Sequence, residues 1–170
     1  MHLDPESDTE VRPATTADAD ALARIYNFYV RETIVTFEEQ TVPAEEMAAR
    51  LLEVQGASLP WLVAEQAGEV VGYAYATKWK GRSGYRFSAE VTVYLDQGRS
   101  GRGIGSNLYR HLLPTLQSRG VHAAIGGIAL PNDASVALHE KFGFEKAAEF
   151  REVGFKFDRW IDVGYWEKIL

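Results

Sequence analysis

The sequence predicts one mixed α/β domain in which helices cover both faces of a central β-sheet. Strand-like and helix-like hydrophobic patterns follow one another in the order β-α-α-β-β-β-α-β-α-β-β, with hairpins in the first half and a crossover helix later. The chain has 170 residues, which suits a single domain, and no repeat, linker or low-complexity tract divides it. We therefore expect a flexible leader over residues 1–8 and one domain over residues 9–170.

The first half of the chain has the pattern of a strand, two helices and a hairpin. A short strand is expected over residues 11–14, and Thr15 with Asp18 has the spacing of a capping box that opens the first helix. Pro43 can occupy the first position of a second helix. Two strand-like runs, WLVAE and VVGYAYA, flank the turn QAGE and predict a hairpin.

The segment SAEVTVYL (88–95) alternates with a period of two, which is typical of a strand. Its odd positions are apolar, and its even positions are more polar and include Glu90. The pattern predicts a strand with one buried face and a carboxylate on the other face.

The remaining elements follow the glycine-rich stretch SGRGIG (100–105). Apolar residues at helical spacing predict a helix from this stretch to near Gly120. A strand over residues 121–130 comes next, followed by a helix that Asn132 can cap and that ends near Phe142. Two strands close the chain.

Composition and charge exclude several classes of function. The net charge is −6, so no basic surface for nucleic acid is expected. The absence of cysteine excludes a thiolate nucleophile, and the four histidines have no metal-binding spacing. No apolar run approaches the roughly 20 residues of a membrane helix, and the acidic N-terminus is unlike a secretory signal. We therefore expect a cytoplasmic protein without a metal, membrane or nucleic-acid partner.

The stretch SGRGIG has the composition of an anion-binding turn. Free N–H groups at a helix N-terminus attract phosphate oxygens, and glycine lets a ligand approach the backbone closely. A tight turn without a ligand is the alternative. The Walker pattern is absent, and the Rossmann fingerprint fails because Ser106 stands where Gly or Ala is needed. The pattern therefore favours a pyrophosphate held by backbone N–H groups, as in coenzyme A.

Four segments of the chain resemble the GNAT superfamily of N-acetyltransferases: AEVTVYL, RSGRGIGSNLYRHLL, LPNDASVALHEKFGF and GFKFDRWIDVGYW. With PWLVAEQAGEVVGYAYA they are similar to one branch, the phosphinothricin/methionine sulfoximine N-acetyltransferases, over residues 9–168. The resemblance implies a twisted, mixed and mostly antiparallel sheet of about seven strands with about four helices on its two faces. Ser100 departs from the superfamily pattern, which usually has Gln or Arg there.

The resemblance also implies which residues bind the co-substrate acetyl-CoA. The pyrophosphate contacts would come from the turn, namely Gly101, Arg102, Gly103, Ile104, Gly105 and Ser106. The pantetheine arm would pair, as a strand does, with Val93, Tyr94 and Leu95. Asn132 matches the asparagine that the family places near the cofactor arm.

Two titratable residues are candidates for proton transfer. Acetyl transfer to an amine needs a base for the ammonium proton, an acid for the thiolate and donors for the developing oxyanion, expected near Val93. Glu90 matches a glutamate of the family, with a salt bridge to Arg82 or Arg86 as the alternative. His139 replaces a tyrosine that many members use as the acid, and its alternative is a structural role. Acid and base roles for His139 both stay open.

The branch acts on α-amino acids with a tetrahedral, oxygen-rich side-chain head: phosphinothricin, methionine sulfoximine or methionine sulfone. Such an acceptor carries at least one anion and needs cationic partners. The expected substrate-binding residues are Phe37, Trp79, Arg82, Arg86 and Lys156. Core packing or a solvated basic loop is the alternative for them. The branch builds its pocket at a homodimer interface, so a homodimer is expected.

We expect direct transfer in a ternary complex, because the chain has no cysteine that could carry the acetyl group. Two other functions stay open. One is an N-acetyltransferase for a different amine, such as a peptide N-terminus or a polyamine. The other is a non-catalytic module that binds acyl-CoA.

Overall fold

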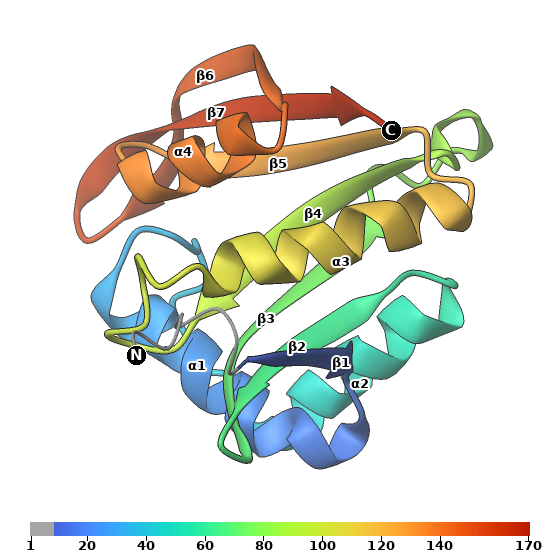
Figure 1. Ribbon diagram of the computed structural model, residues 1–170. Helices are drawn as coiled ribbons and strands as arrows, with labels where there is room; N and C mark the ends of the chain where they lie inside the picture. Colours follow the sequence, from blue (N-terminus) through green and yellow to red (C-terminus); the bar gives the residue numbers. More distant parts are fainter. Residues whose placement is uncertain (1–8) are drawn as a thin grey trace, which may run out of the picture.

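The computed structural model describes residues 9–170, and the predicted leader over residues 1–8 lies outside this part (Figure 1). Seven strands form one sheet in the order β1-β2-β3-β4-β5-β7-β6. The strands are β1 (Glu10–Pro13), β2 (Trp61–Gln66), β3 (Glu69–Lys78), β4 (Ser88–Leu95), β5 (Ala123–Ala129), β6 (Glu145–Lys156) and β7 (Arg159–Ile169). The helices are α1 (Ala19–Glu32), α2 (Ala44–Gly56), α3 (Ile104–Ser118) and α4 (Asp133–Lys141). The predicted mixed sheet with helices is confirmed.

The ends of the first two helices follow from local sequence. The backbone N–H of Thr15 donates to the Asp18 carboxylate over 2.8 Å, as the capping-box spacing predicts. The same carboxylate accepts from Arg12, which ties the start of the helix to β1. Pro43 is one position off the prediction. It has an extended conformation and precedes α2 as its N-cap, so the helix begins at Ala44.

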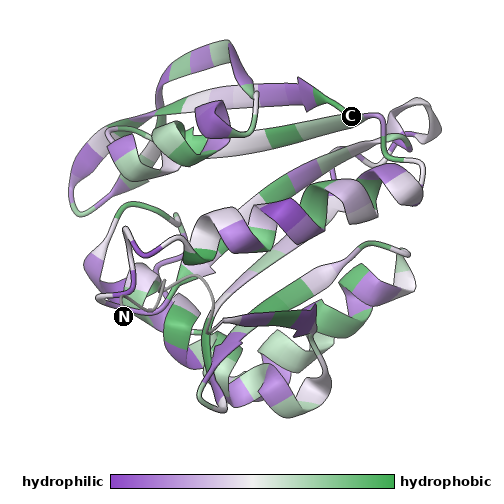
Figure 2. Cartoon of the chain, viewed as in Figure 1, coloured by the Kyte–Doolittle hydropathy of each residue, from purple (hydrophilic) through white to green (hydrophobic). Residues whose placement is uncertain are grey.

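The helices lie on both faces of the sheet, α1 and α2 on one and α3 and α4 on the other. A methyl group at Gly72 of β3 would lie 3.4 Å from Ile104 of α3. The next residue, Tyr73, points the opposite way and packs on Tyr94, whose ring lies 5.3 Å from that of Tyr26 in α1. Figure 2 shows hydrophobic and hydrophilic bands alternating along α3, as expected for a helix with one buried side.

The predicted two-faced pattern of β4 fails at its end. Tyr94 is at an even position but is only 7% exposed, whereas Val93 and Leu95 are half-buried. The reason is that α1 covers the face on which a polar surface was expected. A strand covered on both sides loses its strict alternation.

The parallel pair β4 and β5 is short. Its register covers only Ser88, Ala89 and Glu90 against residues 123–125. Beyond Glu90 the two strands diverge toward the N-terminal ends of α3 and α4 (Figure 1). We call this point the fork. It leaves the backbone edge of residues 91–95 without a partner strand on the β5 side.

Candidate active site

A cavity of about 420 Å³ lies at the fork, between β4, the glycine-rich turn and α4. We call it the cofactor cavity. Eight predicted cofactor residues line it: Val93, Leu95, Gly101, Gly103, Ile104, Gly105, Ser106 and Asn132. Arg102 is exposed and outside the lining, and the side chain of Tyr94 points to the other face of the sheet.

The glycine-rich turn presents free N–H groups to this cavity. Gly101 and Gly103 have φ values of 75° and 78°, a left-handed conformation that suits glycine. The first hydrogen bond at the start of α3 joins the N–H of Asn107 to the oxygen of Gly103 over 2.9 Å. The three preceding N–H groups therefore have no partner within the helix. Gly105 has a packing role as well, because a methyl group there would lie 3.3 Å from Leu138.

Several residues that line the cofactor cavity were not predicted from the sequence. Lys141 lines it and donates to the Ser106 hydroxyl over 3.0 Å, which places a cation beside the turn. Tyr29 also lines it and donates to the oxygen of Leu95 over 2.6 Å. Ala134, Leu138 and Lys141 have helical spacing, and this pattern could have predicted that one side of α4 lines the cavity.

The cofactor cavity fits the chemistry of coenzyme A. Partnerless N–H groups at a helix start and a lysine suit a pyrophosphate. The unpaired edge of β4 suits an arm that carries amide groups, because such an arm can pair as a strand does. Asn132 caps α4 by accepting from the N–H of Ser135 over 3.1 Å and so fixes the opposite wall.

Glu90 occupies the fork as a half-buried carboxylate. Burial raises its pKa, and within residues 9–170 it forms no ion pair. The alternative role is not seen, because Arg86 is exposed and donates to the oxygen of Ser83. Arg82 is exposed in the same loop. A carboxylate with a raised pKa and no partner has the properties of a general base.

His139 is buried in α4, with 3% exposure. Its Nδ1 lies 2.7 Å from the oxygen of Ser135, and its Nε2 lies 2.9 Å from the hydroxyl of Tyr109. A carbonyl can only accept, so Nδ1 carries the proton and Tyr109 donates to Nε2. Burial lowers the pKa of His139 and favours this neutral form.

The side chains of Glu90 and His139 reach the fork from opposite faces of the sheet. A methyl group at Gly126 would lie 2.5 Å from Nε2 of His139. A methyl group at Gly127 would lie 3.6 Å from Oε1 of Glu90. Successive residues of a strand point to opposite faces, so the two titratable groups have the edge of β5 between them.

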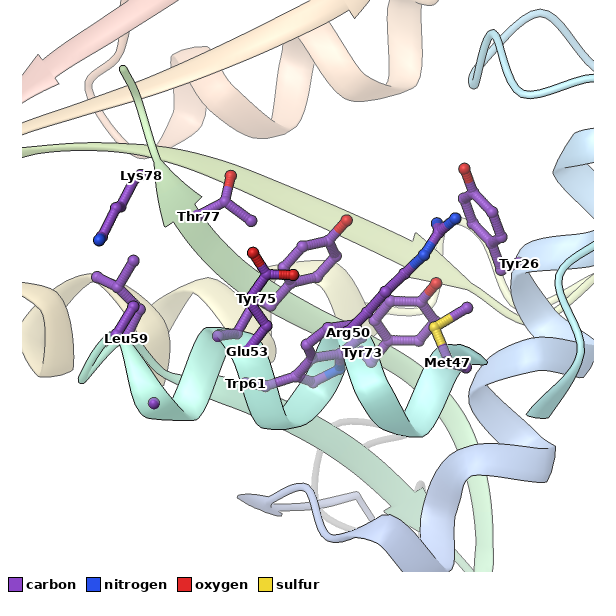
Figure 3. Close-up of a pocket in the computed structure, with 13 residues that line it drawn as sticks. Tyr26, Met47, Arg50, Glu53, Leu59, Trp61, Tyr73, Tyr75, Thr77 and Lys78 are labelled. Atoms are coloured by element: carbon purple, nitrogen blue, oxygen red, sulfur yellow. The ribbon is translucent and has the colours of Figure 1, made fainter. Parts of the chain in front are cut away.

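A second cavity, of about 610 Å³, lies between α2 and the strands β2 and β3 (Figure 3). We call it the acceptor cavity. Tyr75 and Thr77 of β3 line it, and Thr77 is the register partner of Glu90. Paired residues share a face of a sheet, so the cavity and Glu90 lie on the same face. Its lining includes the cations Arg50 and Lys78.

Arg50 is fixed in the acceptor cavity by two carboxylates. It donates to Glu38 and to Glu46, each over 2.6 Å. Its guanidinium lies 5.9 Å from the ring centre of Tyr26, another lining residue. Arg50, Lys78 and Tyr75 were not among the predicted substrate-binding residues. They come from separate elements, and neither a motif nor a spacing in the sequence indicated their convergence.

The predicted aromatic and arginine partners of the substrate lie around this region but do not line the acceptor cavity. Trp79 packs edge-on against Tyr165, with ring centres 5.6 Å apart, and burial, together with the charge of Glu90, raises the pKa of Tyr165. Arg86 lies over Phe87 in the exposed loop that also holds Arg82. The structure thus brings Trp79 toward Glu90 and leaves both arginines in solvent.

Lys156 and Phe37 both make contacts within the protein. Lys156 is 2% exposed, and its ammonium donates to the oxygens of Thr33 and Thr36, each over 2.8 Å. Its hydrogen bonds are thus made within the protein, and substrate contact by Lys156 stays a prediction. Phe37 lies against Gly154, where a methyl group would come within 2.3 Å of the ring.

Within residues 9–170, no group of three or more His, Asp or Glu could hold a metal ion. In the same residues no helix is both long enough and apolar enough to cross a membrane.

Comparison with known proteins identifies the family. The acetyltransferase (GNAT) domain matches residues 11–164. The chain is 40% identical over 159 residues to phosphinothricin N-acetyltransferase of Streptomyces viridochromogenes, covering 94% of this chain and 86% of that protein. It is 34% identical over 155 residues to L-methionine sulfoximine/L-methionine sulfone acetyltransferase of Salmonella typhimurium, covering 91% of each.

A solved acetyltransferase from Salmonella typhimurium, with its cofactor acetyl-CoA, has the same fold with a TM-score of 0.93. It is 33% identical, and the match covers 96% of this chain and 94% of that one. Family, fold and cofactor cavity agree on the co-substrate acetyl-CoA. The chain belongs to the GNAT acetyltransferases and is an acetyl-CoA-dependent N-acetyltransferase.

Proposed function

We propose that the protein acetylates the α-amine of a small amino acid with a tetrahedral side-chain head, such as phosphinothricin, methionine sulfoximine or methionine sulfone. The names of the two relatives support this class of acceptor. The observation that carries the proposal is Glu90, a half-buried base that forms no ion pair within residues 9–170, lies at the fork beside the cofactor cavity and shares a face of the sheet with the acceptor cavity. Lys78 suits an acceptor that carries a carboxylate, whereas Arg50, already paired with Glu38 and Glu46, forms part of the cavity wall beside Glu53.

In this proposal the bound co-substrate supplies an activated acetyl thioester, held by the turn at the start of α3. Glu90 takes the proton of the acceptor ammonium, which makes the amine nucleophilic. The backbone N–H groups near Val93 face the fork and are the proposed donors to the thioester oxygen. Transfer is direct, because no cysteine is present to carry the acetyl group.

A proton-transfer role for His139 is also part of the proposal. Nε2 of His139 lies against Gly126 at the fork and accepts from Tyr109. A proton exchanged at Nε2 therefore involves the Tyr109 hydroxyl. Replacing Tyr109 by Phe should lower kcat if this proton matters, and should leave kcat unchanged if His139 only supports α4.

We propose further that the protein is a homodimer. The β6–β7 hairpin exposes five apolar side chains, each between 47% and 63% exposed: Phe150, Val153, Phe155, Phe157 and Trp160. A second copy would remove this area from water, which favours association. Sedimentation equilibrium should give twice the chain mass, and Trp160→Ser with Phe155→Ser should shift it toward one chain mass. A monomer at all concentrations would contradict the dimer.

The test of the proposed function is the release of free thiol from acetyl-CoA by the purified protein. Phosphinothricin, methionine sulfoximine, methionine sulfone, glutamate, spermidine and a peptide are compared at equal concentration. Fast release with the tetrahedral-headed amino acids alone supports the proposal. Release only with spermidine or the peptide contradicts the acceptor class. Binding of acetyl-CoA without release from any amine contradicts catalysis and favours a binding module.

A further inference from the structure

Lys156 of β6 is a buried cation whose hydrogen-bond partners are all backbone carbonyls, and its Nζ also lies 5.1 Å from the ring centre of Phe157. Its Nζ lies 2.8 Å from the oxygens of Thr33 and Thr36 and 3.4 Å from that of Tyr29. No ion pair is formed with it within residues 9–170. Burying an ammonium is costly unless its donors are satisfied, and these three acceptors satisfy all three of its hydrogens.

The acceptors belong to the end of α1 and the loop that follows it. Tyr29 lies in the last turn of α1 and its oxygen also accepts from Thr33, the C-cap; at this end of the helix the dipole favours a positive charge. Thr36 lies three residues further along. Lys156 therefore ties a strand near the end of the chain to the α1–α2 loop, which we define as residues 33–43.

A second contact beside Lys156 holds the same loop. Phe37 packs on Gly154, two residues before Lys156 in β6, and a side chain at that position would collide with the ring. The loop is thus attached to the hairpin by a charged contact and by an apolar contact.

The α1–α2 loop shapes the acceptor cavity through a chain of contacts. The Thr36 hydroxyl lies 2.8 Å from that of Tyr26, which donates to the carboxylate of Glu38. Glu38 in turn holds the guanidinium of Arg50. Tyr26 and Arg50 both line the acceptor cavity. Moving the loop would therefore move these two side chains.

The same loop also reaches the cofactor cavity. Val35 lines that cavity together with Tyr29, whose backbone oxygen accepts from Lys156. The loop thus lines the cofactor cavity through Val35 and contacts two lining residues of the acceptor cavity, Tyr26 and Arg50.

We propose that Lys156 is a positioning residue that fixes the α1–α2 loop, and thereby Tyr26 and Arg50, so that it sets the affinity for the acceptor without touching it. The link to acceptor affinity rests on the proposed function, and the fixation of the loop does not. A lysine that contacted the acceptor would need a free donor, and Lys156 has none.

The first test is hydrogen–deuterium exchange of the full chain, which needs no substrate. Lys156→Met should speed the amide exchange of residues 34–42 by about tenfold or more, because the charge-assisted bonds are lost. Lys146→Met, on the same strand but exposed, is the matched control and should leave this exchange unchanged. Unchanged exchange in Lys156→Met would overturn the proposal, whatever the acceptor is.

The second test separates positioning from contact. Lys156→Met should raise KM about tenfold for phosphinothricin, for methionine sulfone and for the amide of methionine sulfone alike, with a smaller effect on kcat. Lys156→Arg should recover part of the loss. An increase confined to acceptors with an anionic head or a free carboxylate would show direct contact and overturn the proposal.

Glu38→Gln covers the case in which Lys156→Met does not fold. This change weakens the link from the loop to Arg50 without leaving a buried site empty. It should give the same uniform increase in KM as Lys156→Met, while exchange in residues 34–37 stays near that of the unchanged protein. Acceptor KM values equal to those of the unchanged protein would overturn the proposed route through Arg50.

Discussion

Glu90 is a carboxylate that the fold half-buries without a partner, and its pKa is raised by that burial. The proposed base needs this property, because a raised pKa brings its proton affinity closer to that of the group it must deprotonate. The expected cost of burying this carboxylate is a lower free energy of unfolding at neutral pH. Both consequences can be measured on one substitution.

The first prediction concerns activity. Glu90→Gln should lower kcat by about 10²–10⁴-fold, the usual contribution of a general base. In the unchanged protein, kcat/KM should rise with pH through the raised pKa of Glu90, because only the ionised form accepts a proton. A variant with nearly full kcat at neutral pH would contradict the assignment, and Glu149→Gln, an exposed site, serves as control.

The second prediction concerns stability. Because the pKa of Glu90 is raised on folding, the native state binds its proton more tightly than the unfolded state does. The free energy of unfolding therefore falls as pH rises from the ordinary glutamate pKa through the raised one, and the loss persists above it. Glu90→Gln should be more stable than the unchanged protein at pH 7 and show no such gain at pH 4. Urea unfolding at both values gives the comparison.

At the scale of elements, the glycine-rich turn joins β4 to α3 and needs left-handed backbone. Two glycines with similar left-handed backbone, one in this turn and one outside it, allow this requirement to be tested. Gly101 lines the cofactor cavity with φ 75°, and Gly120 follows α3 with φ 83° far along the same helix. Neither has an atom within 4 Å of an added methyl group, so alanine would strain both in the same way.

The third prediction uses this pair. Gly101→Ala and Gly120→Ala should each lower the free energy of unfolding by about 1–2 kcal/mol, the cost of left-handed backbone in a residue with a side chain. Only Gly101→Ala should raise the Kd for acetyl-CoA, measured by calorimetry. An equal effect of both variants on binding would show that the turn acts through stability alone.

At the scale of the whole molecule, the cofactor cavity lies where the two parts of the sheet separate. A ligand bound there is therefore expected to stabilise the folded sheet. A ligand that binds only the native state adds about 2.7 kcal/mol at a hundredfold excess over Kd. For a domain of this size each kcal/mol raises Tm by about 2–4 °C. Acetyl-CoA at that excess should therefore raise Tm by roughly 5–11 °C. An unchanged Tm would contradict the binding of acetyl-CoA in the cofactor cavity.

Much of the fold could be predicted because its signals are local. The capping box at Thr15, the strand 88–95 and the turn around Gly103 each depend on neighbouring residues, and the structure has all three. The burial of Tyr94 was not predictable in this way, because it depends on α1 covering a face that the strand pattern leaves open.

The acceptor side was the least predictable part. Arg50 and Lys78 meet in one cavity from α2 and β3, and Lys156 reaches a loop more than a hundred residues earlier in the chain. Basic residues in the loop before Glu90 looked suitable by composition, yet Arg82 and Arg86 are in solvent. Charge alone does not tell a side chain that enters a cavity from one that faces water.

The fork has a consequence for how the chain assembles. One part of the sheet, β1 to β4, is formed by residues 10–95, and the other, β5 to β7, by residues 123–169. Each strand pairs only with strands of its own part, except for the three-residue register between β4 and β5. The exposed turn at Gly120 separates these two lengths of chain. Two fragments divided there each keep their own hairpins, and they meet at the short seam, at the contact of Tyr109 with His139 and at the bonds from Lys156 to the α1–α2 loop. Acetyl-CoA, held by residues from both fragments, would then act as the linker that brings a divided enzyme back together.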